Sequence, residues 1–343
     1  MTLVPNAPVG SFPFTTDTRQ AFARACPALL RRADQSGLTR PEDWRAACAD
    51  PNRDPQAFFS RHFTAVRIGD GKGFTTGYFE PEIAGSRTPK PGSAPVYGKP
   101  HDLVEVDLTP FAADLKGRSI RGRWTGKSVA PYFSRAEIEN GALAGRKLEL
   151  AWADDPVELF FLEIQGSGRL RLPDGEVLRI GYAGQNGHPY VAIGRLLRQR
   201  GMLEKPGMEE IIGWIRQNPA AGKALMRENP SAVFFQLADP GLDGPLGTLG
   251  VPLIAEANAA VDPARLPLGA PILARFEMNG APTERMLIAA DTGGAIRGDN
   301  RIDIFWGAGP KARAAAASLA TTIDLLVLLP HAAAERQRQN PPR

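Results

Sequence analysis

Apolar residues near the start of the chain recur at the spacing of an amphipathic helix. Phe22, Ala25 and Leu29 fall on one helical face, and Gly37 is the kind of residue that ends a helix. This stretch and two shorter ones predict helices over residues 16–35, 41–48 and 55–63.

The pattern then changes to short apolar or alternating runs separated by turn residues, which is typical of strands. Two such runs flank a turn at residues 69–73 and predict a hairpin, over residues 63–68 and 74–79. Further strands are predicted over residues 147–151, 159–165, 168–172 and 177–182. Asp174-Gly175 is a hairpin signal between the last two.

Helical spacing returns in the middle of the chain, and strand patterns dominate again after residue 229. The predicted helices cover residues 190–200, 208–217, 219–227 and 310–320. The later strands are predicted over residues 232–236, 251–255, 270–277, 285–290, 302–306 and 323–329. The polar end, residues 331–343, is predicted to be frayed.

These elements predict a mainly β protein with helices. The chain has 343 residues and 43% hydrophobic content, enough for two domains. Residues 89–100 are rich in Pro, Gly and Ser, as linkers and domain boundaries are. The β-rich ends could form one domain interrupted by a mixed middle domain, although two consecutive domains fit the pattern nearly as well.

The charge is mildly basic, with a formal net charge of +4. Such a surface attracts polyanions, including acidic cell-wall polymers. The chain has no run of Lys and Arg with interleaved aromatic residues, so a nucleic-acid partner is not predicted.

The two cysteines, Cys26 and Cys48, do not form a Cys-x-x-Cys pair, and the four histidines are spread along the chain. A metal site is therefore not predicted. The cysteines could form one disulfide in an oxidising compartment or remain two buried thiols.

No stretch of the sequence is long and apolar enough to span a membrane. Residues 1–14 lack the charged start and apolar middle of a signal peptide. The protein is therefore either cytoplasmic or an exported protein in its mature form.

The densest cluster of candidate chemistry lies at residues 289–307. Asp291 ends an apolar strand, and Gly293 and Gly294 allow a ligand to approach the backbone closely. Asp303 stands between two isoleucines, and such neighbours remove water and raise the pKa of a carboxyl group, as a general acid requires. Trp306 could stack on a sugar ring. The plainer alternative is that Asp291 opens a turn and Asp303 pairs on the outer face of a strand.

The Asp-Thr-Gly triplet at 291–293 also resembles aspartic proteases, in which two copies share one proton. The chain has one such triplet, so a protease would have to be a dimer.

A second cluster lies at residues 160–168. On the predicted strand Glu163 and Gln165 point to one face, where carboxylate and amide groups suit sugar recognition. Ser167 lies in a Gly-Ser-Gly turn that is neither a phosphate loop nor a nucleophile elbow. An ordinary half-exposed strand is the alternative.

Two further clusters carry polar and aromatic groups. Tyr182, Asn186 and His188 lie in a Gly-rich loop ahead of a helix, where they could bind sugar or simply form a turn. Glu80 and Glu82 share one face of an extended segment and form either a carboxylate pair or surface charge.

Taken together, these segments resemble the MltA family of lytic transglycosylases, with its C-terminal 3D domain. The matching pieces occur in the family's order, at residues 77–81, 161–168, 182–190, 229–235, 291–296 and 303–307. The resemblance implies a double-psi β-barrel formed by residues 1–98 and 238–343. It also implies a smaller inserted β domain at 99–237, with the glycan in a groove between the two.

Members of this family cleave the β-1,4 bond between N-acetylmuramic acid and N-acetylglucosamine and leave a 1,6-anhydro end, without a metal or cofactor. The resemblance assigns Asp303 as the single acid and base, because the C6 hydroxyl of the sugar replaces the second carboxylate of ordinary glycosidases. Asp291 is similar to a second aspartate that orients Asp303 or binds sugar. The implied substrate-binding residues are Tyr78, Glu80, Glu163, Gln165, Ser167, Tyr182, Asn186, His188, Phe235, Gly293, Gly294 and Trp306.

The resemblance implies peptidoglycan strands and proteins of a cell-wall complex as partners. It also implies the periplasmic side of a Gram-negative envelope, with association to the outer membrane. The chain begins without a signal peptide or a lipid-bearing Cys, which leaves anchoring open. Two rival functions are a dimeric Asp-Thr-Gly protease and a non-catalytic glycan-binding protein.

Overall fold

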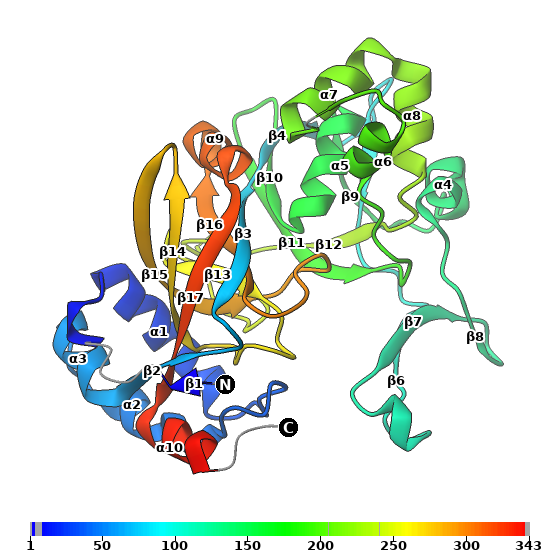
Figure 1. The fold of residues 1–343 in the computed structure, drawn as a ribbon. Helices are drawn as coiled ribbons and strands as arrows, with labels where there is room; N and C mark the ends of the chain where they lie inside the picture. Colours follow the sequence, from blue (N-terminus) through cyan, green and yellow to red (C-terminus); the bar gives the residue numbers. More distant parts are fainter. Residues whose placement is uncertain (1, 4–8, 205, 240, 340–343) are drawn as a thin grey trace. The chain divides into compact units, whose positions relative to one another are not determined.

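The computed structural model describes residues 2–3, 9–204, 206–239 and 241–339, and it divides into two compact units. Unit 1 contains residues 1–80 and 241–343, and unit 2 contains residues 81–240 (Figure 1). The middle of the chain is thus inserted into a unit built from its two ends. The first boundary falls after Glu80 and not after residue 98, because the segment that follows Glu80 pairs within a sheet of unit 2.

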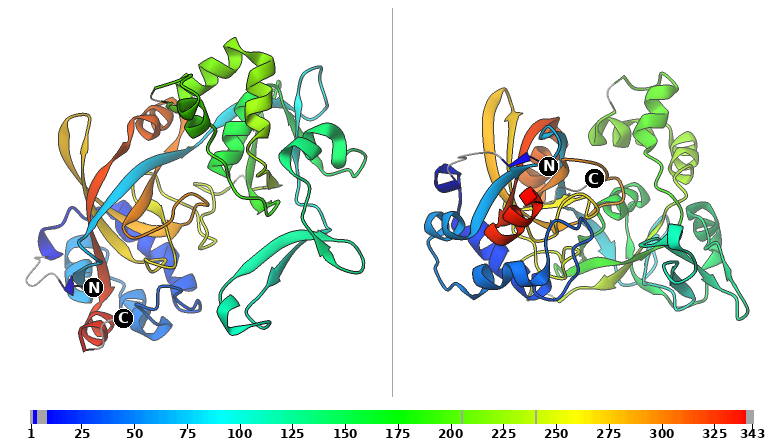
Figure 2. Two further views of the ribbon diagram at one scale, coloured as in Figure 1. Left: turned by 45° about the vertical axis from the view of Figure 1, so that its right-hand side comes forward. Right: turned by 60° about the horizontal axis from the view of Figure 1, so that its bottom comes forward.

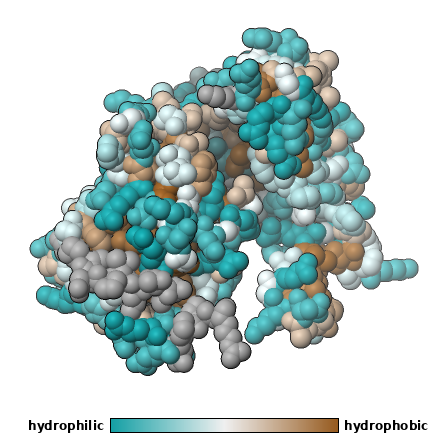
Figure 3. All heavy atoms as spheres, in the orientation of Figure 1, coloured by the Kyte–Doolittle hydropathy of each residue, from teal (hydrophilic) through white to brown (hydrophobic). Residues whose placement is uncertain are grey.

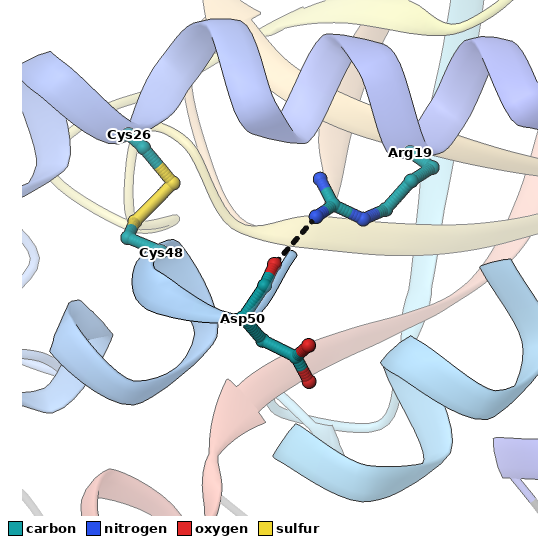
Figure 4. Close-up of a disulfide and its surroundings, with 4 residues drawn as sticks. All are labelled: Arg19, Cys26, Cys48 and Asp50. Carbon is teal, nitrogen blue, oxygen red and sulfur yellow. Dashed lines mark hydrogen bonds between the residues drawn. A yellow bond between two sulfur atoms is a disulfide. The ribbon is translucent and has the colours of Figure 1, made fainter. Parts of the chain in front are cut away.

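Unit 1 begins with a helical region in which a disulfide joins Cys26 to Cys48. Figure 4 shows this bond linking helix α1 to α2, with the Arg19 guanidinium donating to the main-chain oxygen of Asp50 at 2.9 Å. Thr15 caps α1 through its side chain, and Asp54 caps α3. The elements are η1 (Val9–Ser11), α1 (Thr16–Leu29), η2 (Pro41–Trp44), α2 (Arg45–Ala49) and α3 (Pro55–His62). Helix α1 ends at Leu29, earlier than the predicted residue 35.

The strands of unit 1 form one eight-stranded sheet in the order β1-β2-β17-β14-β15-β13-β16-β3. An additional pairing between β17 and β3 closes six of these strands into a circuit. Two pairs in it are parallel, β13 with β15 and β16 with β3. The strands are β1 (Thr2–Leu3), β2 (Phe63–Arg67), β3 (Lys72–Glu80), β13 (Asn258–Val261), β14 (Pro271–Met278), β15 (Ala281–Asp291), β16 (Arg301–Ala308) and β17 (Ala320–Pro330).

The predicted hairpin of residues 63–68 and 74–79 is wrong, because β2 and β3 do not pair with each other. Both pair instead with β17, from the end of the chain. The strand predicted at 251–255 is also wrong, since these residues make only an isolated bridge, between Leu246 and Pro252. The sequence analysis missed β13, which is central to the circuit.

Two helices complete unit 1. Helix α9 (Gly309–Ser318) lies against β3 and β16, with Ala312 and Ala316 buried (Figures 1 and 2). Helix α10 (His331–Gln339) corrects the predicted frayed end, since Arg336 pairs with the buried Asp43 at 2.6 Å. Residues 340–343, also predicted to be frayed, lie outside the described residues.

Unit 2 is built on a six-stranded sheet in the order β12-β11-β10-β4-β9-β5. An isolated bridge between Gly98 and Phe235 links its two edges. The hairpin predicted at Asp174-Gly175 is confirmed by the antiparallel pairing of β10 and β11. The strands are β4 (Glu82–Ser86), β5 (Ala94–Tyr97), β9 (Glu149–Ala153), β10 (Gly168–Arg171), β11 (Val177–Gln185) and β12 (Val233–Leu237).

Helices of unit 2 pack around a second apolar cluster that includes Phe160, Leu197 and Ile212. The strand predicted over residues 159–165 is wrong, because this segment belongs to helix α5. Asp155 caps that helix, Pro156 occupies its first position, and Gly166 ends it in a left-handed conformation. The helical segments are α4 (Arg135–Glu137), η4 (Ile138–Ala142), α5 (Pro156–Gln165), α6 (Ile193–Gln199), α7 (Met208–Gln217) and α8 (Pro219–Arg227).

A three-stranded arm extends from unit 2, and one of its faces is apolar. Directly opposed residues share a face, so Val106 with Ile120 and Trp124 with Val129 lie together. Ile120 and Trp124 are about half exposed, 49% and 50%, and Figure 3 shows the brown side chains on this arm. The arm consists of β6 (Leu103–Asp107), η3 (Ala113–Leu115), β7 (Ser119–Trp124) and β8 (Val129–Ala130).

Candidate active site

The topology of unit 1 aligns two carboxylates across neighbouring strands. Asp303 on β16 lies opposite Thr76 of β3 and opposite Ala260 of β13. Ala260 in turn lies opposite Asp291 at the end of β15. With about 4.8 Å between adjacent strands, the two aspartate backbones lie roughly 10 Å apart. The small side chain of Ala260 stands between them.

Asp303 is a partly buried carboxyl group with one side-chain hydrogen-bond donor. The Thr76 hydroxyl donates to Oδ1 at 2.7 Å. Loss of hydration on burial and, to a smaller extent, the negative charge of Asp291 raise the pKa of Asp303 to about 6. The Thr76 hydrogen bond and the Arg301 charge oppose this rise. Near neutral pH, Asp303 can therefore both donate and accept a proton.

Asp291 has a different environment, with four donors on its two oxygens. Oδ1 accepts from the Thr248 amide, the Thr248 hydroxyl and the Thr292 amide, each at 2.9 Å. Oδ2 accepts from the Tyr78 hydroxyl at 2.9 Å. Burial raises the pKa of Asp291, and these hydrogen bonds oppose the rise. Donors on every side favour the carboxylate, so Asp291 is suited to be a fixed negative charge and not a proton donor.

Tyr78 connects strand β3 to Asp291. Burial, followed by the charge of Asp291, raises the pKa of Tyr78 well above its ordinary value of 10.0, so the hydroxyl remains a neutral donor. Its ring lies beside Phe305, with 5.2 Å between the centroids. Glu80 follows on the same strand but is buried, 2% exposed.

Trp306 packs inside unit 1. It is 8% exposed, and its indole Nε1 lies so near Gly77 that a Cβ at that glycine would come within 2.5 Å. Gly77 is therefore required by this close contact, and little of the Trp306 ring is left for a sugar. Gly293 and Gly294 follow Asp291; Gly293 is half-buried, and Gly294 is exposed and borders open space.

Most of the predicted sugar-binding residues of unit 2 have partners within that unit. Glu163 pairs with the buried Arg135 at 2.6 Å. Asn186 is fully buried and donates to the main-chain oxygens of Phe133 and Pro230. Phe235 belongs to the apolar core, and His188 is hydrogen-bonded to the main-chain oxygen of Tyr132 at 2.7 Å.

Five of the predicted residues of unit 2 keep some accessible surface, among them the half-buried Glu163 and His188. Tyr182 is 47% exposed, and Gln165 and Ser167 are half-buried on either side of the turn that ends α5. Because α5 is a helix, Glu163 and Gln165 point in different directions and not to one face of a strand.

Three residues that contact the two aspartates or their partners were not predicted from the sequence, namely Thr76, Arg301 and Thr248. The two-residue period of strands was available as a signal. It places Thr76 on the face of Tyr78, and Arg301 on the face of Asp303. Thr248 lies in a loop far from Asp291 in sequence, and no local pattern indicates it.

Among the described residues, no cluster of three His, Cys, Asp or Glu side chains could hold a metal ion. The same part of the chain contains no helix of the length and apolar character needed to cross a membrane.

Comparison with known proteins identifies the family of this chain. Residues 74–236 match the MltA specific insert domain, and residues 257–329 match the 3D domain. The chain therefore belongs to the MltA family, as the sequence motifs predicted.

Individual relatives agree with this assignment. The membrane-bound lytic murein transglycosylase A of Vibrio cholerae is 40% identical over 191 residues, 52% of this chain and 51% of that protein. The match thus spans about half the length of this curated relative.

Two solved structures resemble this chain over most of its length. The membrane-bound lytic murein transglycosylase of Agrobacterium tumefaciens aligns with a TM-score of 0.83 and 32% identity, covering 93% of this chain and 95% of that one. Escherichia coli MltA with bound chitohexaose aligns with a TM-score of 0.67 and 26% identity, covering 91% and 89%.

Proposed function

We propose that this chain is a lytic transglycosylase that cleaves the β-1,4 bond between N-acetylmuramic acid and N-acetylglucosamine in peptidoglycan. The activity named for its relatives and the chitohexaose bound by E. coli MltA support a glycan substrate. The observation that carries the proposal is Asp303, whose environment holds its pKa at about 6 beside a second, fixed carboxylate.

The reaction begins with Asp303 in its acid form. Its proton passes to the glycosidic oxygen as the bond from that oxygen to C1 of the N-acetylmuramic acid breaks. The Asp303 carboxylate then takes the proton of the C6 hydroxyl, and O6 bonds to C1. A 1,6-anhydro ring results, and Asp303 is again protonated. The attack benefits from the high effective concentration of a group on the same sugar, and the scheme requires no cofactor.

Asp291 supports this chemistry through its charge. Its carboxylate raises the pKa of Asp303, which keeps a proton available near neutral pH. The same negative charge favours the positive character that develops at C1. Tyr78 and Thr248 hold Asp291 in place through the hydrogen bonds described above.

The closed circuit of six strands with two parallel pairs supports a double-psi β-barrel as the catalytic unit. In unit 2 we place sugar contacts at the accessible groups Tyr182, Gln165 and Ser167. The membrane-bound relatives support a position in a Gram-negative envelope, associated with the outer membrane.

Mass spectrometry of peptidoglycan digests tests the reaction and the residue together. We expect the wild type to release 1,6-anhydro-muropeptides and Asp303→Asn to lose about 10³-fold in rate. The matched control is Asp299→Asn, a more exposed aspartate of the preceding loop, which should remain active. Fragments with ordinary reducing ends would show a hydrolase. Glycan bound but uncut by the wild type would show a binding protein.

A further inference from the structure

Asp303 is the end of a short chain of hydrogen bonds. Arg301 Nη2 donates to the Thr76 hydroxyl at 2.8 Å, and that hydroxyl donates to Asp303 Oδ1 at 2.7 Å. The parallel pairing of β16 with β3 brings these three residues together. It sets Asp303 opposite Thr76, and Arg301 lies two residues earlier on the same face of β16.

Arg301 is held in position by further contacts with the same two strands. Its Nη1 donates to the main-chain oxygens of Ile302 and Phe74, the second at 3.3 Å. Its guanidinium also lies 5.5 Å from the centre of the Phe74 ring. The side chain is therefore fixed before any substrate binds.

The direction of the hydrogen bonds follows from the groups involved. A guanidinium carries donors and no acceptor, so the Thr76 oxygen must accept from Arg301. Thr76 has one hydroxyl proton, and Asp303 Oδ1 is the acceptor in front of it. Oδ1 therefore accepts a hydrogen bond whether or not Asp303 is protonated. The proton of the acid form is left to Oδ2.

We propose that Thr76 and Arg301 are positioning residues that keep the transferable proton of Asp303 on Oδ2 and set the acidity of this carboxyl group. The inference rests on the proposed function for its consequence in catalysis. The effect of both residues on the acidity of Asp303 can be measured without any substrate.

Electrostatics support the same roles. The charged or titratable groups that act on Asp303 are Arg301 on its own strand, Asp291 from β15 and Tyr78 from β3. The Thr76 hydrogen bond and the Arg301 charge lower the pKa of Asp303, and Asp291 raises it. Removing either positioning residue should therefore make Asp303 a weaker acid.

The direct test is a carbon-13 NMR titration of the aspartate carboxyl carbons, with Asp303 assigned by comparison with Asp303→Asn. We expect the titration midpoint of Asp303 to rise by roughly one pH unit in Thr76→Val and in Arg301→Gln.

Thr76→Ser restores the hydroxyl and should return the midpoint to the wild-type value. The matched control is Arg297→Gln, because Arg297 is an exposed arginine in the loop before β16, and this variant should leave the midpoint unchanged. Midpoints equal to the wild type in both Thr76→Val and Arg301→Gln would overturn the proposal.

The second readout is the pH profile of kcat/KM on peptidoglycan. The alkaline limb reports loss of the acid form, so it should move upward together with the NMR midpoint, while kcat falls about tenfold and KM stays nearly constant. A residue with only a structural role would lower activity without moving that limb, and this result would count against the proposal. A wild type that releases no anhydro products would refute the proposed function, while the NMR titration would still show whether Thr76 and Arg301 set the acidity of Asp303.

Discussion

Asp291 and Asp303 are the same residue type in two environments, and their neighbours give them different chemistry. Asp291 accepts four hydrogen bonds, and together they favour its carboxylate form. Asp303 accepts one side-chain hydrogen bond, from Thr76, and stands between the buried residues Ile302 and Ile304. Two carboxyl groups in different environments can give one site both a fixed negative charge and a proton donor.

The raised pKa of Asp303 also predicts a cost in stability near neutral pH. A carboxyl group whose pKa is higher in the folded state stabilises the fold while it is protonated. This contribution is complete below its ordinary value of 3.8 and is lost as the pH rises through about 6. Asp303→Asn, which is neutral at every pH, should therefore raise the free energy of unfolding at pH ~7.5 by on the order of 1 kcal/mol, with no gain at pH ~4.

Urea denaturation of both proteins at the two pH values measures this difference. Asn can still accept the Thr76 hydrogen bond, so the substitution removes the charge without removing the contact. Asp299→Asn is the control, because its carboxylate is 57% exposed. A less stable Asp303→Asn at neutral pH would show that the ionised carboxylate is favourable in the fold.

At the scale of helices and strands, the sequence predicted best those elements whose first or last residues are typical of an element's end. Helix α7 matches its predicted bounds, and α8 begins at Pro219 as the Asn-Pro pair predicted. Helix α5 was misread as a strand because its apolar run is short and aromatic. Its Asp155, Pro156 and Gly166 were the better signals, since caps specify helix ends more directly than hydrophobicity does.

The N-terminal helices are held together by a covalent link as well as by packing. The cysteine spacing left the state of Cys26 and Cys48 open, and the structure joins them across 22 residues of sequence. This bond ties α1 to α2 beside the aromatic cluster of Phe22, Trp44 and Phe63. A disulfide also fits an oxidising compartment such as the proposed periplasmic site.

Replacing both cysteines by alanine should lower the free energy of unfolding of unit 1 by roughly 3 kcal/mol, because the reduced chain gains freedom in its unfolded state. Thermal unfolding of the oxidised protein, the reduced protein and the double variant measures the effect. The double variant should also lose its response to a reducing agent. Equal melting temperatures in oxidising and reducing buffer for the wild type would contradict the prediction.

At the scale of the whole molecule, unit 1 depends on pairing between the two ends of the chain. Strands β2 and β3 come from the first 80 residues, and both pair with β17 near the end. Local patterns predicted that the β-rich ends could share a domain, but they carry no information on which strands become neighbours. Both aspartates lie in one predictable segment, whereas Thr76 and Tyr78 reach them only through this long-range pairing. The sequence therefore predicted the two carboxylates and missed most of the groups that change their pKa values.

This nesting predicts that residues 81–240 fold alone and that residues 1–80 do not. The inserted segment contains a whole six-stranded sheet, from β4 to β12, and its own apolar clusters. The buried pair of Arg135 and Glu163 also lies entirely within it.

Purified fragment 81–240 should therefore show a cooperative thermal transition by circular dichroism, and Arg135→Ala should lower its midpoint by leaving Glu163 unpaired in the interior. The fragment should not cut peptidoglycan, since Asp291 and Asp303 lie outside it. Residues 1–80 should stay largely without strands, because β2 and β3 pair with strands after residue 300, and the fragment itself contains only the two-residue strand β1 as a partner of β2. An unfolded 81–240 fragment would show that unit 2 depends on unit 1. A stably folded 1–80 fragment would show that this part of unit 1 does not need its pairing with β16 and β17.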